Sequence, residues 1–380
     1  MKYFIIAGEA SGDLHGAGLM RQLQHFDSSA AFVGLGGDKM RAMGCQMVQD
    51  YRNMAFMGIS AVLRNLDKVN ENFRLAEAAL MEQQPDALIL IDYPSFNLRI
   101  AAYCKKHLPQ TRIFYYIPPK IWAWKRWRVH KIARLSDLVL GIFPFEPAFY
   151  AGYGYQAQYV GNPTMDSVHA YRADQPQTIE REKVIAILPG SRRQEIAKCL
   201  PTMLDAARQE SDYRIVVAGA PGIEPSFYAR FVQDEALVFG ETYPLLSRAS
   251  VAIVNSGTAT LEAALLGCPQ VAVYHIACGH FLWKIRRLVF SIPFFTLVNI
   301  LGNKEVIKEC IGPLFTTTNV AHETRRLLSD APYRENMLHE YEQIRTMLGT
   351  TPAASTAAKQ IVEYMQKNAG EEQGDRIKKS

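Results

Sequence analysis

The sequence lacks a hydrophobic run long enough to cross a membrane. A spanning helix needs about 20 consecutive apolar residues, and the best candidate, residues 281–300, is broken by basic residues and by Pro293. Nor is there a positively charged leader with a cleavage site, because Met1 and Lys2 lead directly into an expected strand. We therefore expect a cytoplasmic chain with neither a signal peptide nor a transmembrane helix.

Spacings typical of metal and redox sites are also missing. The six cysteines form no C-x-x-C pair, and the chain contains no D-x-D and no G-x-G-x-x-G. Disulfides, a bound metal and a dehydrogenase cofactor are accordingly not expected.

The chain also has little excess of one charge over the other. With 42 Lys+Arg against 37 Asp+Glu, the net charge is +5, which is too mild for a dedicated nucleic-acid binder but compatible with an anionic ligand or a membrane surface. A length of 380 residues favours two domains of ordinary size.

Residues 251–274 form the most informative segment of the sequence, because they show a complete βαβ pattern. A buried run, Val251–Val254, is followed by a small-residue turn and an apolar helix that ends at Gly267. A helix N-terminus at the end of a strand attracts anions. This pattern predicts a nucleotide site with the diphosphate at Ser256, Gly257 and Thr258 and sugar hydroxyls near Glu262; the alternative is an ordinary crossover helix with a solvent-facing Glu.

A second anion-binding pattern follows the expected strand Val184–Leu188. Gly190 frees the backbone, Ser191 is suited to cap the next helix, and Arg192 or Arg193 can bind a phosphate with a forked guanidinium. The alternative is an exposed pair of arginines at a helix start, which competes only if this loop lies away from residues 256–258.

Acidic side chains mark the strand ends of the first half. The strand Lys2–Ala7 opens into a loop that holds Glu9 and Asp13, and the buried strand Asp86–Ile91 delivers Asp92 at its carboxyl end. Parallel sheets keep their chemistry at that edge. Asp92 is the best candidate for a general base, although it could instead tie the turn at Pro94.

Aromatic and basic residues gather at three places where an acyl chain or a membrane could bind. These residues are Phe56, Met57, Trp122, Trp124, Trp127, Phe281, Trp283, Arg286 and Arg287. For 120–134, a nucleic-acid surface and a solvated helix with buried tryptophan anchors are the alternatives. For 56–57 core packing competes, and for 276–300 a buried inter-domain helix. A turn and helix over 297–309 carry Asn299 and Glu305, which could meet a nucleotide.

Taken together, these motifs resemble the lipid-A-disaccharide synthase family over nearly the whole chain and in the right order. The blocks that carry the resemblance are GEASGDLHG at 8–16, MG at 57–58, IDYPSFN at 91–97, IPPKIWAWKRWR at 117–128, FPFE at 143–146, VGNP at 160–163, LPGSRRQE at 188–195, NSGTATLE at 255–262 and LVNIL…KEVIKE at 297–309.

The resemblance implies a GT-B glycosyltransferase, an α/β protein in which two Rossmann-like domains with parallel sheets face a central cleft. We expect residues 1–165 to bind the acceptor, completed by a C-terminal helix at 345–367, and 166–344 to bind the UDP-sugar, with a polar tail at 368–380. The family joins UDP-2,3-diacylglucosamine to 2,3-diacylglucosamine 1-phosphate by an inverting β-1,6 transfer in lipid A biosynthesis.

The same resemblance assigns roles to residues. Asp92 matches the first aspartate of the acidic motif, with Glu9 or Asp13 in reserve, and Arg192 matches the PGSR arginine. The nucleotide positions become Ser191, Ser256, Gly257, Thr258, Glu262, Asn299 and Glu305, with Gly190 in the loop. Implied partners are the two acylated sugars, the cytoplasmic leaflet of the inner membrane of a Gram-negative bacterium and a second copy of the chain, without nucleic acid or metal.

Two positions depart from the family pattern. Ser95 stands where many members have a second aspartate, and Ala61 stands where a Glu usually follows the MG motif. The rivals that remain are another GT-B enzyme on UDP-N-acetylglucosamine, such as a 2-epimerase or a transferase with a soluble acceptor, and a nucleotide-sugar-binding protein without turnover.

Overall fold

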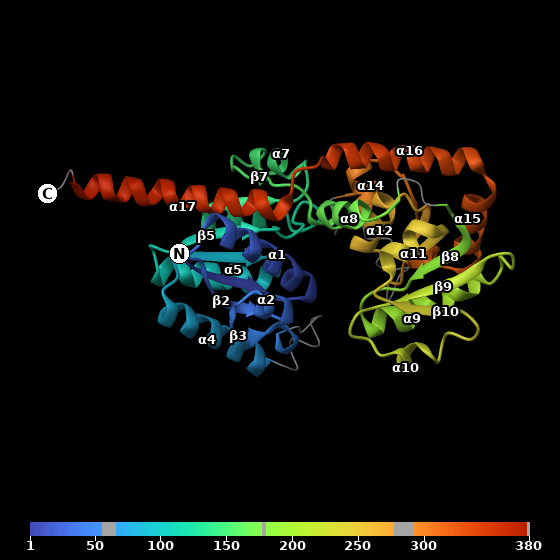
Figure 1. The fold of residues 1–380 in the computed structure, drawn as a ribbon, viewed down its shortest axis with the longest axis horizontal. Helices are drawn as coiled ribbons and strands as arrows, with labels where there is room; N and C mark the ends of the chain where they lie inside the picture. The colour runs from blue at the N-terminus through green and yellow to red at the C-terminus, as the bar shows by residue number, and fades with distance from the viewer. Residues whose placement is uncertain (55–65, 177–179, 277–291, 378–380) are drawn as a thin grey trace. The chain divides into compact units, whose positions relative to one another are not determined.

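A computed structural model describes residues 1–54, 66–176, 180–276 and 292–377. The chain divides into two compact units: Met1–Pro163 together with Thr350–Ser380, and Thr164–Gly349. The chain thus leaves the first unit once and returns to it at its end (Figure 1). The boundary lies within a few residues of the one expected at 165.

The first unit is built on a seven-stranded sheet of order β3-β2-β1-β4-β5-β6-β7, and every pairing in it is parallel. Its strands are β1 (Lys2–Ala7), β2 (Ala31–Gly36), β3 (Gln46–Asp50), β4 (Ala87–Ile91), β5 (Arg112–Tyr116), β6 (Leu138–Gly141) and β7 (Gln158–Tyr159). The strand order runs outward in both directions from the β1/β4 pair. Ligands of such sheets bind beyond the carboxyl ends of the strands where the order reverses.

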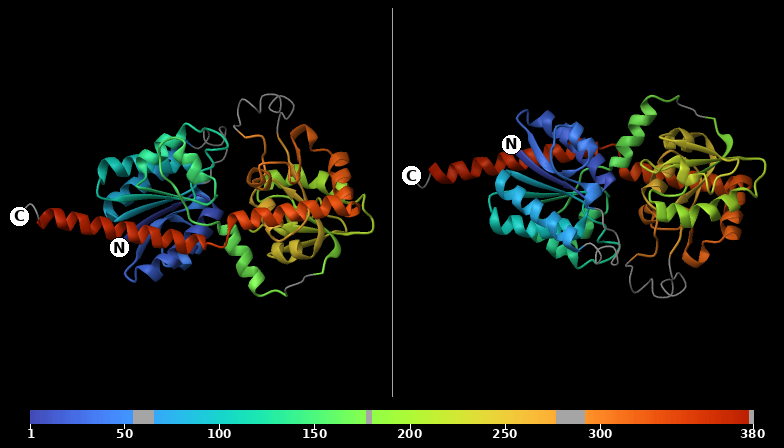
Figure 2. Two further views of the ribbon diagram at one scale, coloured as in Figure 1. Left: turned by 90° about the horizontal axis from the view of Figure 1, so that it is seen from above. Right: turned by 90° about the horizontal axis from the view of Figure 1, so that it is seen from below.

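Helices cover both faces of this sheet (Figure 2). One face carries α1 (Ala10–Phe26), α2 (Asp38–Ala42) and α17 (Ala353–Ile377), and the other carries α4 (Leu66–Gln83), α5 (Pro94–His107) and α6 (Arg128–Leu135). Side chains of β1 alternate between them: Phe4 and Ile6 pack on the second face, whereas Tyr3 and Ile5 pack on the first. Two short helices, η1 (Tyr51–Asn53) and α7 (Glu146–Ala151), complete the unit.

The second unit holds a six-stranded parallel sheet of order β10-β9-β8-β11-β12-β13. Its strands are β8 (Glu182–Leu188), β9 (Arg214–Gly219), β10 (Ala236–Phe239), β11 (Ala249–Asn255), β12 (Gln270–Tyr274) and β13 (Lys308–Ile311). Here the order reverses between β8 and β11, which places the ligand edge of the unit after Leu188 and Asn255.

The helices of this unit form two sets, one on each face of the sheet, as expected for right-handed crossovers between parallel strands. One set comprises α9 (Arg193–Ala207), α10 (Pro225–Tyr228) and α15 (Thr317–Ser329), and the other comprises α11 (Thr242–Arg248), α12 (Thr258–Leu265), α14 (Leu297–Gly302) and α16 (Ala331–Leu348). The helix α8 (Pro163–Ala173) leads into the unit, and η2 (Gly312–Leu314) follows β13.

Three predicted segments differ from the structure. The helix expected through 309 ends at Gly302, because Asn303 adopts a left-handed backbone (φ 50°), and the chain then pairs with β12 as β13. The helix expected at 345–367 is divided at Gly349 (φ 66°) between α16 and α17. The expected polar tail from 368 is helical through Ile377.

Two predicted absences concern the described residues only. The five cysteines described, Cys45, Cys104, Cys199, Cys268 and Cys310, are buried free thiols. In the same ranges, we find no helix long and apolar enough to span a bilayer.

Candidate active site

The β1/β4 edge of the first unit brings two loops together. Gly8 follows β1, and a Cβ atom there would clash with the ring of Tyr93, which follows β4. Glu9 occupies the N-cap position of α1 and is half-buried. Glu9 and Asp92 therefore belong to one edge of the same sheet, as the sequence predicts.

Asp92 lies in a strained turn. The φ angles of Asp92 and Tyr93 are 43° and 45°, a left-handed conformation that costs a non-glycine residue about 1–3 kcal/mol. Two neighbours hold the turn: the Asn97 amide donates to the Asp92 carbonyl (2.7 Å), and the Tyr115 hydroxyl donates to the same oxygen (2.7 Å). Strain kept in place by a buried amide and a buried tyrosine is typical of a functional position.

The Asp92 carboxyl has the properties that a general base needs. Its side chain keeps solvent access on one side, while the surrounding protein raises its pKa above the ordinary aspartate value; the charge of Lys120 and the Tyr93 backbone N–H act in the opposite direction. A carboxylate that a substrate can reach and whose basicity is increased can accept a proton from a hydroxyl.

The Asp13 carboxylate is buried and hydrogen-bonded to backbone N–H groups. Its carboxylate is 3% exposed and accepts hydrogen bonds from the backbone N–H groups of Gly37 (2.8 Å), Lys39 (3.1 Å) and Met40 (3.0 Å). It therefore caps the N-terminus of α2. The prediction of Asp13 as a reserve base is corrected, because its oxygens are committed to backbone donors.

The β8/β11 edge of the second unit joins the two loops predicted to bind phosphate. Val254 pairs with Leu188, so the loops that follow these strands lie side by side. Gly190 has a φ of 116°, and a Cβ atom there would lie 2.5 Å from the Asn255 Nδ2 atom. The loop that carries Arg192 and Arg193 therefore lies beside residues 256–258. The alternative of an exposed arginine pair required this loop to lie elsewhere.

Two helix N-termini open on this edge. α9 begins at Arg193 and α12 at Thr258, and in the described structure their N-cap residues, Arg192 and Gly257, supply no side-chain cap. Ser191, predicted to cap α9, precedes the cap position instead. Ser191, Gly257 and Thr258 are exposed and Ser256 is partly so, which leaves this edge accessible to an anion.

The two arginines have different neighbours. Arg192 Nη1 lies 2.9 Å from Glu195 Oε1, and the Arg192 side chain is 47% exposed. Arg193 instead pairs with Glu224, and its guanidinium lies 5.1 Å from the centre of the Phe227 ring. Both guanidinium groups are paired, but the partner of Arg192 lies on the same helix, α9, whereas Arg193 is held beside α10 by Glu224 and Phe227; the structure thus favours Arg192 as the phosphate ligand.

Glu262 lies one turn into α12 and is oriented by Tyr243 of α11. The Tyr243 hydroxyl donates to Glu262 Oε1 at 3.0 Å. Burial raises the pKa of the Glu262 carboxyl, and the Tyr243 hydrogen bond opposes that shift.

Asn299 and Glu305 do not join this edge. The Asn299 side chain is fully buried, accepts hydrogen bonds from the N–H groups of Val306 (2.8 Å) and Ile307 (2.9 Å), and donates to Glu309 (2.9 Å). Glu305 precedes β13, at the edge where the parallel strands begin, and pairs with Lys308. The prediction that both residues contact the nucleotide is corrected. The Asn299 amide is buried and hydrogen-bonded within the unit, and Glu305 lies at the edge opposite the phosphate-binding loops.

The tryptophans of the aromatic and basic stretch divide into two kinds. Trp122 is 4% exposed and donates its indole N–H to Glu146 (3.1 Å), so it is a buried anchor. Trp124 and Trp127 are 43% and 65% exposed. The remaining members predicted to meet acyl chains or a membrane, Phe56, Met57, Phe281, Trp283, Arg286 and Arg287, lie outside the described residues, as does Ala61.

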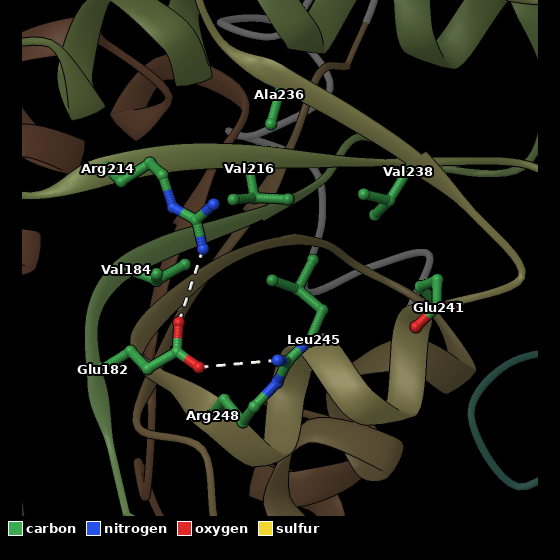
Figure 3. A pocket seen from close by; sticks show the side chains of 9 residues that line it. All are labelled: Glu182, Val184, Arg214, Val216, Ala236, Val238, Glu241, Leu245 and Arg248. Carbon is green, nitrogen blue, oxygen red and sulfur yellow. Dashed lines mark hydrogen bonds and ion pairs between the residues drawn. The ribbon is translucent and has the colours of Figure 1, made fainter.

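A cavity of about 400 Å³ lies on the second unit, between α11 and the strands β8, β9 and β10 (Figure 3). It is lined by Glu182, Val184, Arg214, Val216, Ala236, Val238, Glu241, Leu245 and Arg248. Glu182 pairs there with Arg214 (3.4 Å) and Arg248 (3.5 Å). Glu182, Arg214 and Ala236 are the first residues of their strands, so this cavity lies away from the phosphate-binding edge.

Lys120, Glu146 and Tyr243 were not among the predicted site residues. Lys120 and Glu146 stand in the quoted blocks IPPKIWAW and FPFE and follow buried strands, which is a signal that could have found them. Nothing in the sequence around Tyr243 indicates that its hydroxyl meets Glu262.

The family model and the curated relatives that match this chain point to the same family. The family model described as lipid-A-disaccharide synthetase matches residues 3–364. A lipid-A-disaccharide synthase from Myxococcus xanthus is 36% identical over 381 residues, covering 96% of this chain and 97% of that protein. One from Trichlorobacter lovleyi is 36% identical over 361 residues, covering 92% and 93%.

Solved structures similar to this chain share its fold. A UDP-GlcNAc 2-epimerase from Neisseria meningitidis bound to UDP-GlcNAc has a TM-score of 0.63 at 13% identity, covering 97% of this chain and 100% of that one. The calicheamicin glycosyltransferase has a TM-score of 0.59 at 14% identity, covering 96% and 98%. At such identities the likeness establishes the GT-B architecture and nothing about substrates.

Proposed function

The chain belongs to the lipid-A-disaccharide synthetase family, and we propose that it joins UDP-2,3-diacylglucosamine to 2,3-diacylglucosamine 1-phosphate by a β-1,6 bond with release of UDP. Membership of this family makes it a glycosyltransferase. The observation that carries the proposal is the family match over residues 3–364, together with a basic carboxylate at one sheet edge and two open helix N-termini at the other.

Asp92 is the proposed general base. In an inverting transfer, the acceptor 6-hydroxyl attacks the anomeric carbon, its proton passes to a carboxylate, and the bond from that carbon to the UDP oxygen breaks. The raised pKa and the solvent access of Asp92 support this role. Glu9, at the same edge, is the reserve.

The nucleotide half of the reaction belongs to the β8/β11 edge. Negative charge develops on the diphosphate as it leaves, and preorganised dipoles and cations stabilise such charge. The N-termini of α9 and α12 and the guanidinium of Arg192 are the groups available, and Glu262 is placed to accept hydrogen bonds from sugar hydroxyls. These groups support a transfer that proceeds without a metal or another cofactor.

The acylated substrates imply work at a membrane surface. We place the protein peripherally on the cytoplasmic leaflet of the inner membrane, supported by exposed Trp124 and Trp127 with their basic neighbours. Lys125 Nζ lies 4.2 Å from the centre of the Trp124 ring, and the Arg128 guanidinium lies 5.6 Å from that of Trp127. A homodimer, suggested by the resemblance, is part of the same proposal and is tested by analytical ultracentrifugation.

The decisive experiment supplies both diacylated substrates to purified protein, with and without EDTA, and follows UDP and disaccharide by mass spectrometry. Equimolar UDP and disaccharide, formed equally in both conditions, are expected. Disaccharide formed only without EDTA would contradict metal independence, and UDP-sugar consumed without disaccharide would contradict the transfer itself. The 2-epimerase alternative is not favoured, because the epimerase likeness is limited to the fold.

A further inference from the structure

Three neighbouring strands of the first unit deliver three charged residues to one edge. β4, β5 and β6 are adjacent and parallel. Asp92 follows β4, Lys120 follows β5 after two prolines, and Glu146 follows β6. Because carboxyl ends of parallel strands meet at the same edge, the segments that carry this lysine and these two carboxylates leave the sheet side by side.

The buried carboxylate of Glu146 is held by several hydrogen-bond donors. Its side chain is 1% exposed, and its carboxylate accepts hydrogen bonds from the backbone N–H groups of Ile142 (2.8 Å) and Phe143 (3.0 Å) and from the indole N–H of Trp122 (3.1 Å). Gly141 makes room for it, since a Cβ atom there would lie 2.6 Å from Glu146 Oε2. Three converging donors fix this carboxylate in one orientation.

Trp122 transmits that orientation to the segment that carries Lys120. Its ring packs edge-on against Phe145 (5.0 Å between ring centres) and Phe143 (5.8 Å), and the ring is 4% exposed. Only one residue separates Lys120 from this anchor. The lysine keeps solvent access. The surrounding protein lowers the pKa of Lys120 by desolvation, and the negative charges of Asp92 and Glu146 oppose that shift.

We propose that Glu146, through Trp122, holds Lys120 where its charge acts on Asp92, so that Lys120 and Glu146 are positioning residues for the proposed catalytic base. The catalytic role of Asp92 rests on the proposed function. The effect of Lys120 and Glu146 on Asp92 does not, and it can be measured without substrate.

The electrostatic consequence has a definite sign. Lys120 lowers the pKa of Asp92 against the opposing effect of burial, whereas burial raises the pKa of Glu146 to about 7. Among the residues that the structure describes, the other titratable or charged groups around the three include Tyr115, Tyr150, Arg128, Glu9 beside Tyr93, and Arg126, whose Nε donates to the Trp122 carbonyl (3.3 Å). Loss of the Lys120 charge therefore raises the pKa of Asp92. Because a base works only when ionised, the fall in kcat/KM at low pH then moves to higher pH.

Glu146 can act in two ways that move Asp92 in opposite directions. As a nearby negative charge it disfavours ionisation of Asp92, so its neutralisation would lower the pKa of Asp92. As the anchor of Lys120 it favours ionisation, so its loss would raise that pKa. The sign of the shift in Glu146→Gln separates the two roles.

The test is a ¹³C-carboxyl NMR titration of Asp92 in the full-length protein, with the resonance assigned by its loss in Asp92→Asn. We expect the pKa of Asp92 to rise in Lys120→Met and to stay near the wild-type value in Lys120→Arg, which keeps the charge. We expect a rise in Glu146→Gln and in Trp122→Phe, which keeps the ring packing but loses the indole donor. Lys106→Met, a loss of the same charge from an exposed position on α5, should leave Asp92 unchanged.

The double variant Lys120→Met/Glu146→Gln should titrate like Lys120→Met alone, because Glu146 acts through the lysine. An unchanged or lower pKa of Asp92 in Lys120→Met would overturn the proposal. A lower or unchanged pKa in both Glu146→Gln and Trp122→Phe would overturn the part assigned to Glu146.

Activity profiles separate this inference from the proposed function. If wild-type protein forms the disaccharide, kcat/KM of Lys120→Met should fall several-fold on the acidic side of the pH profile, where Asp92 becomes protonated, and recover toward the wild-type value at higher pH. A uniform loss at all pH values would contradict a positioning role. If wild-type protein forms no disaccharide, the proposed function fails, while the titration of Asp92 still decides the inference.

Discussion

Carboxylates and amides near the strand ends fall into two groups according to what their oxygens accept. The Asp13 carboxylate and the Asn299 carbonyl oxygen accept backbone N–H groups from segments remote in sequence and are buried. Asp92 retains solvent access, and Glu262 is oriented by a tyrosine hydroxyl. Sequence position identifies such residues, but it does not separate the groups, because the partners of Asp13 and Asn299 are set by tertiary packing.

Arg192 and Arg193 are neighbouring arginines with different partners, so one can serve as the control for the other. Arg192→Ala should weaken UDP binding by about 1.5–3 kcal/mol, since hydrogen bonds to charged groups are commonly worth that much. Arg193→Ala is the control, because that guanidinium is held beside α10 by Glu224 and by the Phe227 ring, whereas the partner of Arg192 lies on α9 itself. Isothermal titration calorimetry with UDP measures both, and equal losses in the two variants would contradict the assignment of Arg192.

Buried strands are the elements that the sequence predicts best. The apolar runs of β1, β4, β8 and β11 coincide closely with observed strands, because a strand buried on both faces must be continuously apolar. The edge strand β3 (QMVQD) and β13 (KECI) were missed or assigned to a helix. Their polar residues carry no strong period, and only pairing with a neighbouring strand defines them.

The C-terminal helix α17 docks on the first unit through buried apolar side chains. Ile361 is fully buried in the cluster that α17 forms with α1 and the sheet. Ile361→Ala should destabilise the first unit by about 2–5 kcal/mol through lost burial and the cavity left behind. Lys359→Ala is the control, since this side chain is 60% exposed and should change stability by less than about 0.5 kcal/mol. Urea unfolding followed by circular dichroism measures the effect, and an Ile361→Ala transition at the wild-type midpoint would contradict the docking of α17.

At the scale of the whole molecule, each unit contributes one edge with its own chemistry. The first unit supplies a carboxylate and exposed tryptophans, and the second supplies helix N-termini and Arg192. The two-unit organisation and both edges could be predicted from strand ends and small-residue turns, whereas the Glu146 anchor depends on packing between segments that follow different strands.

The proposed membrane surface is tested on the intact protein. Trp127→Ala should reduce binding to vesicles that contain anionic lipid several-fold, because an exposed indole beside basic residues inserts at the lipid interface. Met347→Ala, at an exposed apolar side chain of the second unit (46% exposed), serves as the control. Vesicle flotation measures the bound fraction; an undiminished fraction for Trp127→Ala would contradict the proposed surface.

The central claim is that Asp92 performs the proton transfer while a separate edge binds the nucleotide. Its most direct test is Asp92→Asn, assayed for disaccharide by single-turnover mass spectrometry and for UDP by calorimetry, with the exposed Asp212→Asn as the control for loss of one carboxylate. We expect transfer to fall by about 10²–10⁴-fold, with UDP affinity close to that of the wild type. Near-normal transfer by Asp92→Asn would contradict the account and move the base to another residue.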